Sequence, residues 1–147
     1  MGKLVINHNL VTREKAEAEF SSAAEDLSTI AVELKATGKI IGIISIQEDS
    51  IRYGVESREI SYLLRESEAR KGYMKEALSA LIKHFFEAEK LTCVAARSFL
   101  PNIASQRLLE SLGFQREGTV RRCVKGYQDT VFDDCLYSLM REDWQPV

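Results

Sequence analysis

Hydrophobic residues recur along this 147-residue chain with two different periods, one typical of strands and one typical of helices. Apolar and β-branched residues are concentrated in 28–48, 58–66, 91–98, 114–126 and 130–142. The two halves of 28–48 flank Thr37–Gly38–Lys39, a short connection that predicts a β-hairpin. Segment 91–98 is almost continuously apolar, as expected for a strand that is covered on both faces.

The clearest helical pattern begins near Gly72 and ends near Glu89. Its apolar residues recur so that they share one wide stripe: Ala77, Leu78, Leu81, Ile82, Phe85 and Phe86. A second helix is expected after Pro101, over 102–113, where Gly113 is a good C-terminal stop. Its apolar positions are Ile103, Ala104, Leu108, Leu109 and Leu112. Segment 12–26, rich in Ala and Glu, predicts a further helix.

The order of these elements predicts the fold class. The succession of strand 58–66, helix 72–89 and strand 91–98 implies a right-handed crossover, so these two strands are expected to pair in parallel. We expect the remaining strands to pair antiparallel, the last two with each other. The sequence therefore predicts one α/β domain over residues 1–147, with a mixed, mostly antiparallel sheet, a central parallel pair and flanking helices.

Composition and charge exclude several classes of function. The chain is 45% hydrophobic and 29% charged, which is ordinary for a globular protein. Its net charge of −2 gives no electrostatic argument for nucleic acid or anionic membrane as a partner. No apolar run reaches the ~18 residues of a membrane span, and residues 1–10 lack the apolar h-region and cleavage site expected of a signal peptide. We expect a cytoplasmic protein.

The cysteines and histidines offer no metal or nucleophile motif. Cys93, Cys123 and Cys135 match no zinc or redox spacing, and Cys93 and Cys135 lie in predicted strands, which favours buried, reduced thiols. A nucleophilic Cys needs a nearby His as its base. His8 is expected in a loop, and His84 on the side or surface of its helix. No metal is expected.

The helix at 72–89 begins unusually, with Arg70, Lys71 and Gly72. Helix N-termini favour acidic residues because the macrodipole places partial positive charge there, so two cations conflict with that rule. The N–H groups of a first helical turn have no partner within the helix and can bind an anion. A glycine at this place has no Cβ, so the anion can come close to the backbone. We expect a phosphate or pyrophosphate site over 70–75, although a solvated basic helix start is an alternative. The motifs GxxxxGK[ST] and GxGxxG are absent, which disfavours nucleoside triphosphates and NAD.

Three stretches resemble the GCN5-related N-acetyltransferase (GNAT) superfamily, and more narrowly its RimJ/RimL-like branch of ribosomal-protein N-terminal acetyltransferases. They read "REISYLLRESEARKGYMKEALSALIKHFF", "PNIASQRLLESLGFQREG" and "YSLMREDW". The resemblance covers about residues 28–144. It implies the GNAT acyl-CoA N-acyltransferase fold, acetyl-CoA as the cosubstrate, and an amine as the acceptor.

The resemblance also implies which residues hold acetyl-CoA. The family's pyrophosphate loop reads Gln/Arg-x-x-Gly-x-Gly/Ala, which Gly72 matches and from which Ala69 and Met74 depart. Because backbone amides make these contacts, we expect the departures to weaken binding little. For Asn102, a helix N-cap after Pro101 is a second, compatible role. The implied cofactor-binding residues are Leu64, Arg70, Lys71, Gly72, Tyr73, Met74, Lys75 and Asn102.

The family transfers the acetyl group directly, in a ternary complex. Many members protonate the leaving thiolate from a Tyr whose position Leu109 occupies here. Ser105, one turn after Asn102, is implied as the donor in its place, with an ordinary helical Ser as the alternative. The backbone N–H near Leu64 is expected to polarise the thioester carbonyl, because this strand is usually bulged and splayed in the family.

Glu59 is the preferred base for deprotonating the amine, because it begins the strand that leads to the phosphate loop. An exposed charge at a strand edge is the alternative role of Glu59, and Glu66 and Glu68 are alternative bases. Tyr62, on the same strand, is expected to pack in the core.

The family also bears on the N-terminus and the assembly. Members of this branch usually begin with a longer segment that forms part of the acceptor pocket, so residues 1–27 are interpreted as a shortened one. Only 3–7 is a candidate for the opening strand. If that strand is missing, a second chain is expected to cover the exposed edge, which predicts a homodimer.

We therefore expect an N-acetyltransferase that moves the acetyl group of acetyl-CoA to a primary amine, on a protein N-terminus or a small molecule. A non-catalytic acyl-CoA-binding or regulatory module is the alternative, because the usual Tyr and the longer N-terminus are missing. A structural domain without a ligand is a third possibility.

Overall fold

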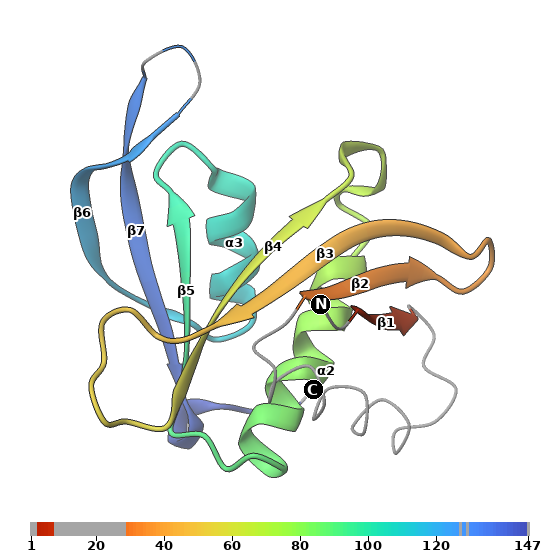
Figure 1. Cartoon of the computed structure of the whole chain (residues 1–147), viewed down its shortest axis with the longest axis horizontal. Helices are drawn as coiled ribbons and strands as arrows, with labels where there is room; N and C mark the ends of the chain where they lie inside the picture. Colours follow the sequence, from red (N-terminus) through yellow and green to blue (C-terminus); the bar gives the residue numbers. More distant parts are fainter. Residues whose placement is uncertain (1–2, 8–28, 127, 129, 147) are drawn as a thin grey trace.

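The computed structural model describes residues 3–7, 29–126, 128 and 130–146, and its strands form one seven-stranded sheet (Figure 1). The strand order is β1-β2-β3-β4-β5-β7-β6. The strands are β1 (Lys3–Asn7), β2 (Thr29–Leu34), β3 (Lys39–Gln47), β4 (Ser57–Leu64), β5 (Cys93–Phe99), β6 (Gln115–Lys125) and β7 (Val131–Met140). The helices are η1 (Glu66–Glu68), α2 (Tyr73–Glu87), α3 (Ile103–Ser111) and η3 (Arg141–Asp143).

The predicted mixed sheet is confirmed. β4 and β5 form the central parallel pair, while β2–β3, β3–β4, β5–β7 and β6–β7 are antiparallel. The β2–β3 hairpin turns at the expected place, where Gly38 has a φ of 70°.

One expectation about the sheet is wrong, because β1 pairs with β2 in parallel. A parallel neighbour needs a long connection, and residues 8–28 supply one. β1 therefore lies beside β2, the edge of β2 is paired, and the argument for a second chain that covers this edge loses its basis.

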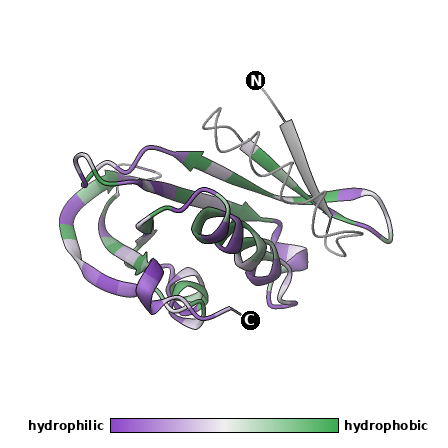
Figure 2. Ribbon diagram, turned by 90° about the horizontal axis from the view of Figure 1, so that it is seen from below, coloured by the Kyte–Doolittle hydropathy of each residue, from purple (hydrophilic) through white to green (hydrophobic). Residues whose placement is uncertain are grey.

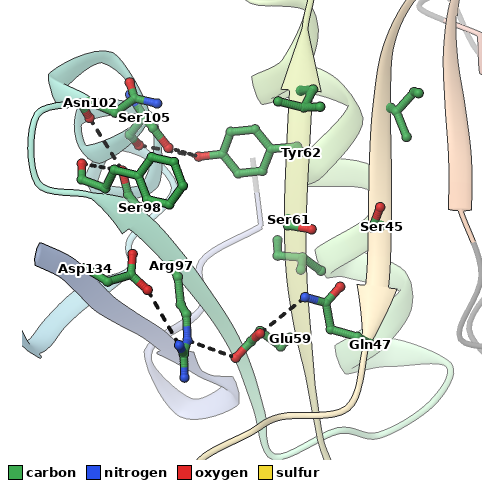
Figure 3. A pocket seen from close by; sticks show the side chains of 14 residues that line it. Ser45, Gln47, Glu59, Ser61, Tyr62, Arg97, Ser98, Asn102, Ser105 and Asp134 are labelled. Atoms are coloured by element: carbon green, nitrogen blue, oxygen red, sulfur yellow. Dashed lines mark hydrogen bonds and ion pairs between the residues drawn. The ribbon is translucent and has the colours of Figure 1, made fainter. Parts of the chain in front are cut away.

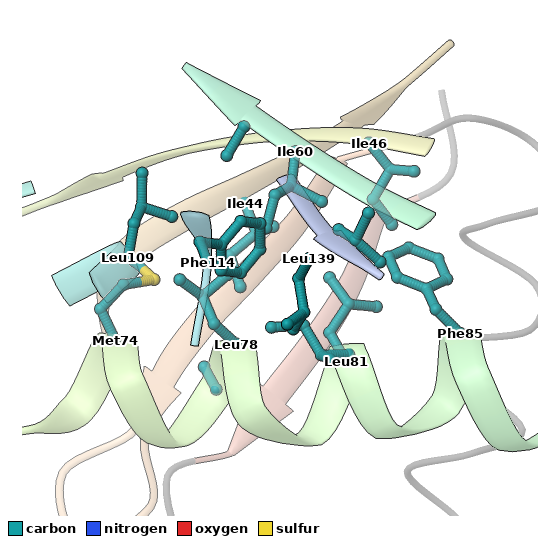
Figure 4. Close-up of a cluster of buried hydrophobic side chains, with 14 of the residues drawn as sticks. Ile44, Ile46, Ile60, Met74, Leu78, Leu81, Phe85, Leu109, Phe114 and Leu139 are labelled. Atoms are coloured by element: carbon teal, nitrogen blue, oxygen red, sulfur yellow. The ribbon is translucent and has the colours of Figure 1, made fainter. Parts of the chain in front are cut away.

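Helix α2 packs its apolar stripe against one face of the sheet, as predicted. Leu78, Leu81 and Phe85 are fully buried against strand residues such as Ile44 and Ile60 (Figure 4). Hydrophilic and hydrophobic colours alternate around the turns of α2 in Figure 2, as this amphipathic pattern requires. The helix thereby fixes where its own N-terminus lies relative to β3 and β4.

The prediction for His84 is wrong. Its side chain is 2% exposed and belongs to the buried face of α2, with Nε2 3.2 Å from Oε2 of Glu89. The apolar pattern of α2 is wide enough that the position beside Phe85 also faces the protein interior.

Helix α3 also packs on the face that α2 covers, and Leu109 lies close to Met74 in Figure 4. Gly113 follows the helix with a φ of 95°, as expected of a C-terminal glycine. The expectation that Ile103 and Ala104 belong to the apolar face of this helix is wrong, since both are exposed and Gln106 is buried instead. The Gln106 amide donates to the carbonyl oxygens of Phe99 and Leu100, which ties α3 to the end of β5.

Cys93 and Cys135 are buried and free, as predicted, whereas Cys123 is exposed on β6.

In the part of the chain that the structure describes, no helix is long and apolar enough to cross a membrane. The helix expected over 12–26 and His8 lie outside the described residues.

Candidate functional site

The central strands separate, and this separation creates the candidate site. β4 and β5 pair only from Ser57↔Cys93 to Ile60↔Ala96. Beyond that point β4 stays paired with β3 as far as Leu64, while β5 stays paired with β7 as far as Phe99. The β3–β4 register has no shift, so β4 is splayed from β5 without the bulge that was expected.

A cavity of about 350 Å³ lies along this gap (Figure 3). Side chains alternate between the two faces of a strand, and Ile60 and Ala96 face α2. The same alternation places Glu59 and Arg97 on the opposite face. The cavity therefore connects the two faces of the sheet. Its lining residues are Ile43, Ser45, Gln47, Glu59, Ile60, Ser61, Tyr62, Leu63, Arg97, Ser98, Phe99, Asn102, Ser105 and Asp134.

We call the part of the cavity on the helix face the hydroxyl end, defined by Tyr62, Ser98, Asn102 and Ser105. The Tyr62 hydroxyl and Ser105 Oγ are 2.7 Å apart, so one donates a hydrogen bond to the other. Asn102 Oδ1 accepts from the Ser105 N–H at 3.1 Å, which makes Asn102 the N-cap of α3. These bonds fix Ser105 at the start of the helix.

The sequence prediction for Tyr62 was incomplete. Its ring packs against the core, as expected, but its hydroxyl reaches the cavity and bonds to Ser105. Burial raises the pKa of the Tyr62 phenol, and the hydrogen bond with Ser105 opposes that effect. The phenol therefore keeps its proton to a higher pH than an ordinary tyrosine.

We call the part on the opposite face the carboxylate end, defined by Gln47, Glu59, Arg97 and Asp134. Glu59 is 8% exposed, so its alternative role as an exposed edge charge is wrong. Its Oε2 accepts from Gln47 Nε2 at 3.2 Å, and its Oε1 accepts from Ser50 Oγ at 3.1 Å. Arg97 Nε lies 3.5 Å from the same Oε1.

Asp134 and Arg97 were missed by sequence reasoning. Arg97 Nη1 lies 3.5 Å from Asp134 Oδ2, so the guanidinium lies between Asp134 and Glu59. Burial raises the pKa of the Asp134 carboxyl, as does the charge of Glu59, while Arg97 lowers it. The sequence feature that could have identified Asp134 is an acidic residue within the otherwise apolar strand pattern "VFDDCLYSL".

The backbone of β4 also faces the gap. The Arg65 N–H donates to the Ile41 carbonyl on β3 at 2.7 Å. Because backbone groups alternate in direction along a strand, the N–H groups of Tyr62 and Leu64 point away from β3, toward the gap. Gly42 on β3, opposite Leu64, lets β3 and β4 pair closely here, since a Cβ on Gly42 would lie 2.8 Å from the Leu63 carbonyl oxygen.

The expected phosphate loop leads into α2 as a tight backbone turn. Gly72 is the N-cap of α2, with a φ of 81° and no side-chain cap, and Arg70 also has a positive φ of 64°. The first N–H groups of a helix have no acceptor within the helix, so this turn presents backbone donors. A Cβ on Gly72 would have no neighbour within 4 Å, so the loop is open at this point.

The side chains of this loop differ in where they lie. Met74 is buried in the core, so only its backbone is available to a ligand, while Tyr73 is half-buried and Lys75 is exposed. The Lys71 ammonium is 3.1 Å from Oε2 of Glu68 in η1. Glu66 and Glu68, the alternative bases, do not line the cavity.

The known proteins that this chain resembles are N-acetyltransferases. The family model described as "Acetyltransferase (GNAT) domain" matches residues 5–115. The chain is similar to the uncharacterized N-acetyltransferase YoaA of Bacillus subtilis, 32% identical over 111 residues that cover 75% of this chain and 60% of YoaA. It is similar also to the uncharacterized N-acetyltransferase YnaD of the same organism, 29% identical over 93 residues, or 63% of this chain and 54% of YnaD. The chain thus spans between about half and two thirds of the length of these relatives.

Solved structures with a similar fold include the ribosomal-protein-S5-alanine acetyltransferase of Vibrio fischeri. It has a TM-score of 0.73 and 26% identity over 88% of this chain and 70% of that one. Mycobacterium smegmatis RimJ, solved in complex with CoA-disulfide, has a TM-score of 0.69 over 85% of this chain and 59% of its own. At 23% identity, RimJ shows likeness of fold alone.

Proposed function

Because the chain belongs to the GNAT acetyltransferase family, we propose that it transfers the acetyl group of acetyl-CoA to a primary amine, by direct transfer in a ternary complex. The amine is that of a protein N-terminus or of a small molecule. The observation that carries this proposal is the cavity through the β4–β5 gap, which joins a hydroxyl end and a carboxylate end on opposite faces of the sheet. Two substrates entering from opposite faces meet in this gap.

On the donor side, the pyrophosphate of acetyl-CoA binds the backbone N–H groups over residues 70–75. Gly72 has a left-handed conformation and is the N-cap of α2, so the loop leads directly into the first turn, whose N–H groups have no acceptor within the helix. Arg70, Lys71 and Lys75 supply positive charge around that turn. The pantetheine arm then follows the open edge of β4, where the N–H groups of Tyr62 and Leu64 face the gap, with Asn102 on the other side.

At the reacting centre, the hydroxyl end supplies the proton that the leaving thiolate takes up. Ser105 donates it, and Tyr62 replaces it through their shared hydrogen bond. The Leu64 N–H polarises the thioester carbonyl. None of the three cysteines takes part, because the amine attacks the thioester directly and no acyl-enzyme is formed.

At the other end, a carboxylate removes a proton from the ammonium form of the acceptor. Glu59, which the sequence favoured, is one of the two carboxylates there. The proposal includes a cytoplasmic location, which the buried, free thiols of Cys93 and Cys135 support. A homodimer stays a prediction, to be checked by light scattering on the purified protein.

Release of free CoA thiol from acetyl-CoA tests this function, with a panel of alanine-starting peptides, polyamines and simple alkylamines. Amine-dependent release that increases with enzyme concentration supports the proposal. Tight CoA binding without release on any amine, and unchanged by Glu59→Gln, would favour the non-catalytic module. A protein whose melting temperature does not change with CoA would be a structural domain.

A further inference from the structure

The geometry points to Asp134, rather than Glu59, as the group that binds the acceptor's ammonium and takes its proton. This inference rests on the proposed function, which requires an amine acceptor and a carboxylate that takes its proton. It assigns Glu59 a different part, as the residue that positions Arg97 beside Asp134.

Asp134 offers an oxygen without a partner. The residue is 2% exposed, it lines the cavity, and its Oδ1 has no hydrogen-bond donor among the described residues. A buried carboxylate oxygen without a donor is costly, so it is retained where a ligand supplies the donor. An ammonium group carries three N–H donors and a charge of the right sign.

Glu59 is already satisfied. Its Oε1 accepts from Ser50 and faces the Arg97 guanidinium, and its Oε2 accepts from Gln47. Of the two carboxylates, Asp134 is therefore the one with an oxygen free to accept from an incoming ammonium. The raised pKa of the Asp134 carboxyl agrees with a role as proton acceptor.

Arg97 occupies the place of a cation but is loosely held there. Both of its ion-pair contacts with the carboxylates are 3.5 Å long, and its side chain is 33% exposed. A shorter hydrogen bond runs from its Nη2 to Ser50 Oγ, at 2.7 Å. An incoming ammonium binds the partnerless Oδ1 of Asp134, while Arg97 keeps its contacts with Ser50 and Glu59.

The protons balance between the two substrates, this chain and solvent. The Asp134 carboxylate takes one proton from R–NH₃⁺, and the neutral amine attacks the thioester carbon. The C–S bond breaks with its electron pair on sulfur, and the thiolate takes a proton from Ser105, which Tyr62 replaces. The nitrogen loses its second proton to solvent as the amide forms, and Tyr62 regains one proton from solvent. Asp134 releases its own proton to solvent after the products leave, so the reaction liberates one proton in all.

The acceptor itself separates this role from others. Ethylamine is an ammonium ion near neutral pH, whereas hydroxylamine is a neutral amine there and needs no base before attack. In Asp134→Asn, kcat with ethylamine should fall by about 100-fold or more, while kcat with hydroxylamine stays close to that of wild type. Asp133→Asn is the matched control, because the neighbouring side chain points to the other face of β7 and accepts from the Arg122 N–H. Equal losses with both amines would overturn the assignment.

The pH profile identifies the base. The charged groups that act on Asp134 are Glu59 from β4 and Arg97 from β5. Its register partners, Phe99 on β5 and Val120 on β6, are uncharged. The acid limb of kcat/KM with ethylamine should disappear in Asp134→Asn and persist in Glu59→Gln. The opposite result would make Glu59 the base and overturn the inference.

A binding measurement keeps the inference testable if the wild-type protein releases no CoA with any amine, an outcome that would count against the proposed function alone. Ethylammonium chloride is titrated into wild type, Asp134→Asn and Asp133→Asn, with CoA present and absent, and amide chemical shifts are recorded. Binding should be about tenfold weaker in Asp134→Asn only. Equal binding by all three proteins would overturn the inference.

Discussion

The start of α2 and the carboxylate end of the cavity are built from different parts of the chain. The first is a continuous turn, residues 70–75, whose donors are backbone N–H groups. The second gathers side chains from β3, β4, β5 and β7, which the strand registers bring to one face. One region offers partial positive charge to an anion, and the other offers carboxylates to a cation.

This difference predicts how each region responds to mutation. A site made of backbone groups tolerates side-chain changes but fails when its backbone conformation changes. A site made of side chains can lose its function when a single side-chain group is replaced, even though the backbone stays the same. We therefore expect the grip on CoA to depend on Gly72 and the choice of acceptor to depend on the carboxylate end.

The largest expected effect is that of Gly72→Glu. A non-glycine residue at a φ of 81° is strained, and the new carboxylate would stand beside the bound pyrophosphate. CoA affinity measured by calorimetry should fall by about 100-fold or more. Gly54→Glu is the matched control, since Gly54 also has a positive φ and open space around it but does not line the cavity. Affinity that survives Gly72→Glu would contradict the backbone site.

The hydroxyl end should respond as side chains do. Ser105→Ala and Tyr62→Phe should each lower kcat by about 10- to 100-fold and leave CoA affinity unchanged. Because the two hydroxyls share one hydrogen bond, the double variant should lose little more than either single one. The raised pKa of Tyr62 also places the alkaline fall in kcat above the pH at which an ordinary tyrosine ionises. Rates equal to wild type in the single variants would remove both residues from the mechanism.

A smaller effect concerns stability at the carboxylate end. The pKa of Asp134 is raised by folding, so the folded state binds its proton more tightly than the unfolded state does. Its contribution is therefore most favourable at low pH and is lost as the pH rises through the folded-state pKa. Asp134→Asn should consequently unfold at a higher temperature than wild type near neutral pH, and this difference should shrink in acid. Calorimetric melting from acid to neutral pH measures it, and a variant that is less stable at neutral pH would contradict it.

The smallest effect is expected from the loop cations. Arg70 is exposed, and Lys71 already pairs with Glu68, so both charges act through solvent. The double variant Arg70→Gln, Lys71→Gln should weaken CoA binding by only about threefold to tenfold, and less at high salt. A loss as large as that of Gly72→Glu would mean that side chains, and not the backbone, hold the anion.

Features that depend on residues close together in the chain, such as helices and turns, could be predicted from the sequence. Contacts that depend on how the strands pair could not. The stripe of α2, the stop at Gly113 and the turn at Gly72 are local patterns, and the structure has all three. Tyr62 and Ser105 are 43 positions apart in the chain. Their hydroxyls form a hydrogen bond because β4 separates from β5 after Ile60, which leaves room for the start of α3 beside Tyr62. No local pattern contains that geometry.

The same reasoning explains the carboxylate end. Asp134 lies opposite Phe99 in the β5–β7 register, which places it on the face that carries Arg97 and Glu59. A shift of one residue in that register would have placed Asp133 there instead. Gly42 is a similar case, because its need for glycine comes from the carbonyl of Leu63 on the next strand.

In the proposed complex, CoA binds the backbone donors at the start of α2 and runs along the open edge of β4. Amide chemical shifts recorded while CoA is titrated into the full chain test this placement residue by residue. We predict saturable changes concentrated at the amides of residues 70–75 and at those of Tyr62 and Leu64. Saturable binding that moves other amides and leaves these unchanged would contradict it.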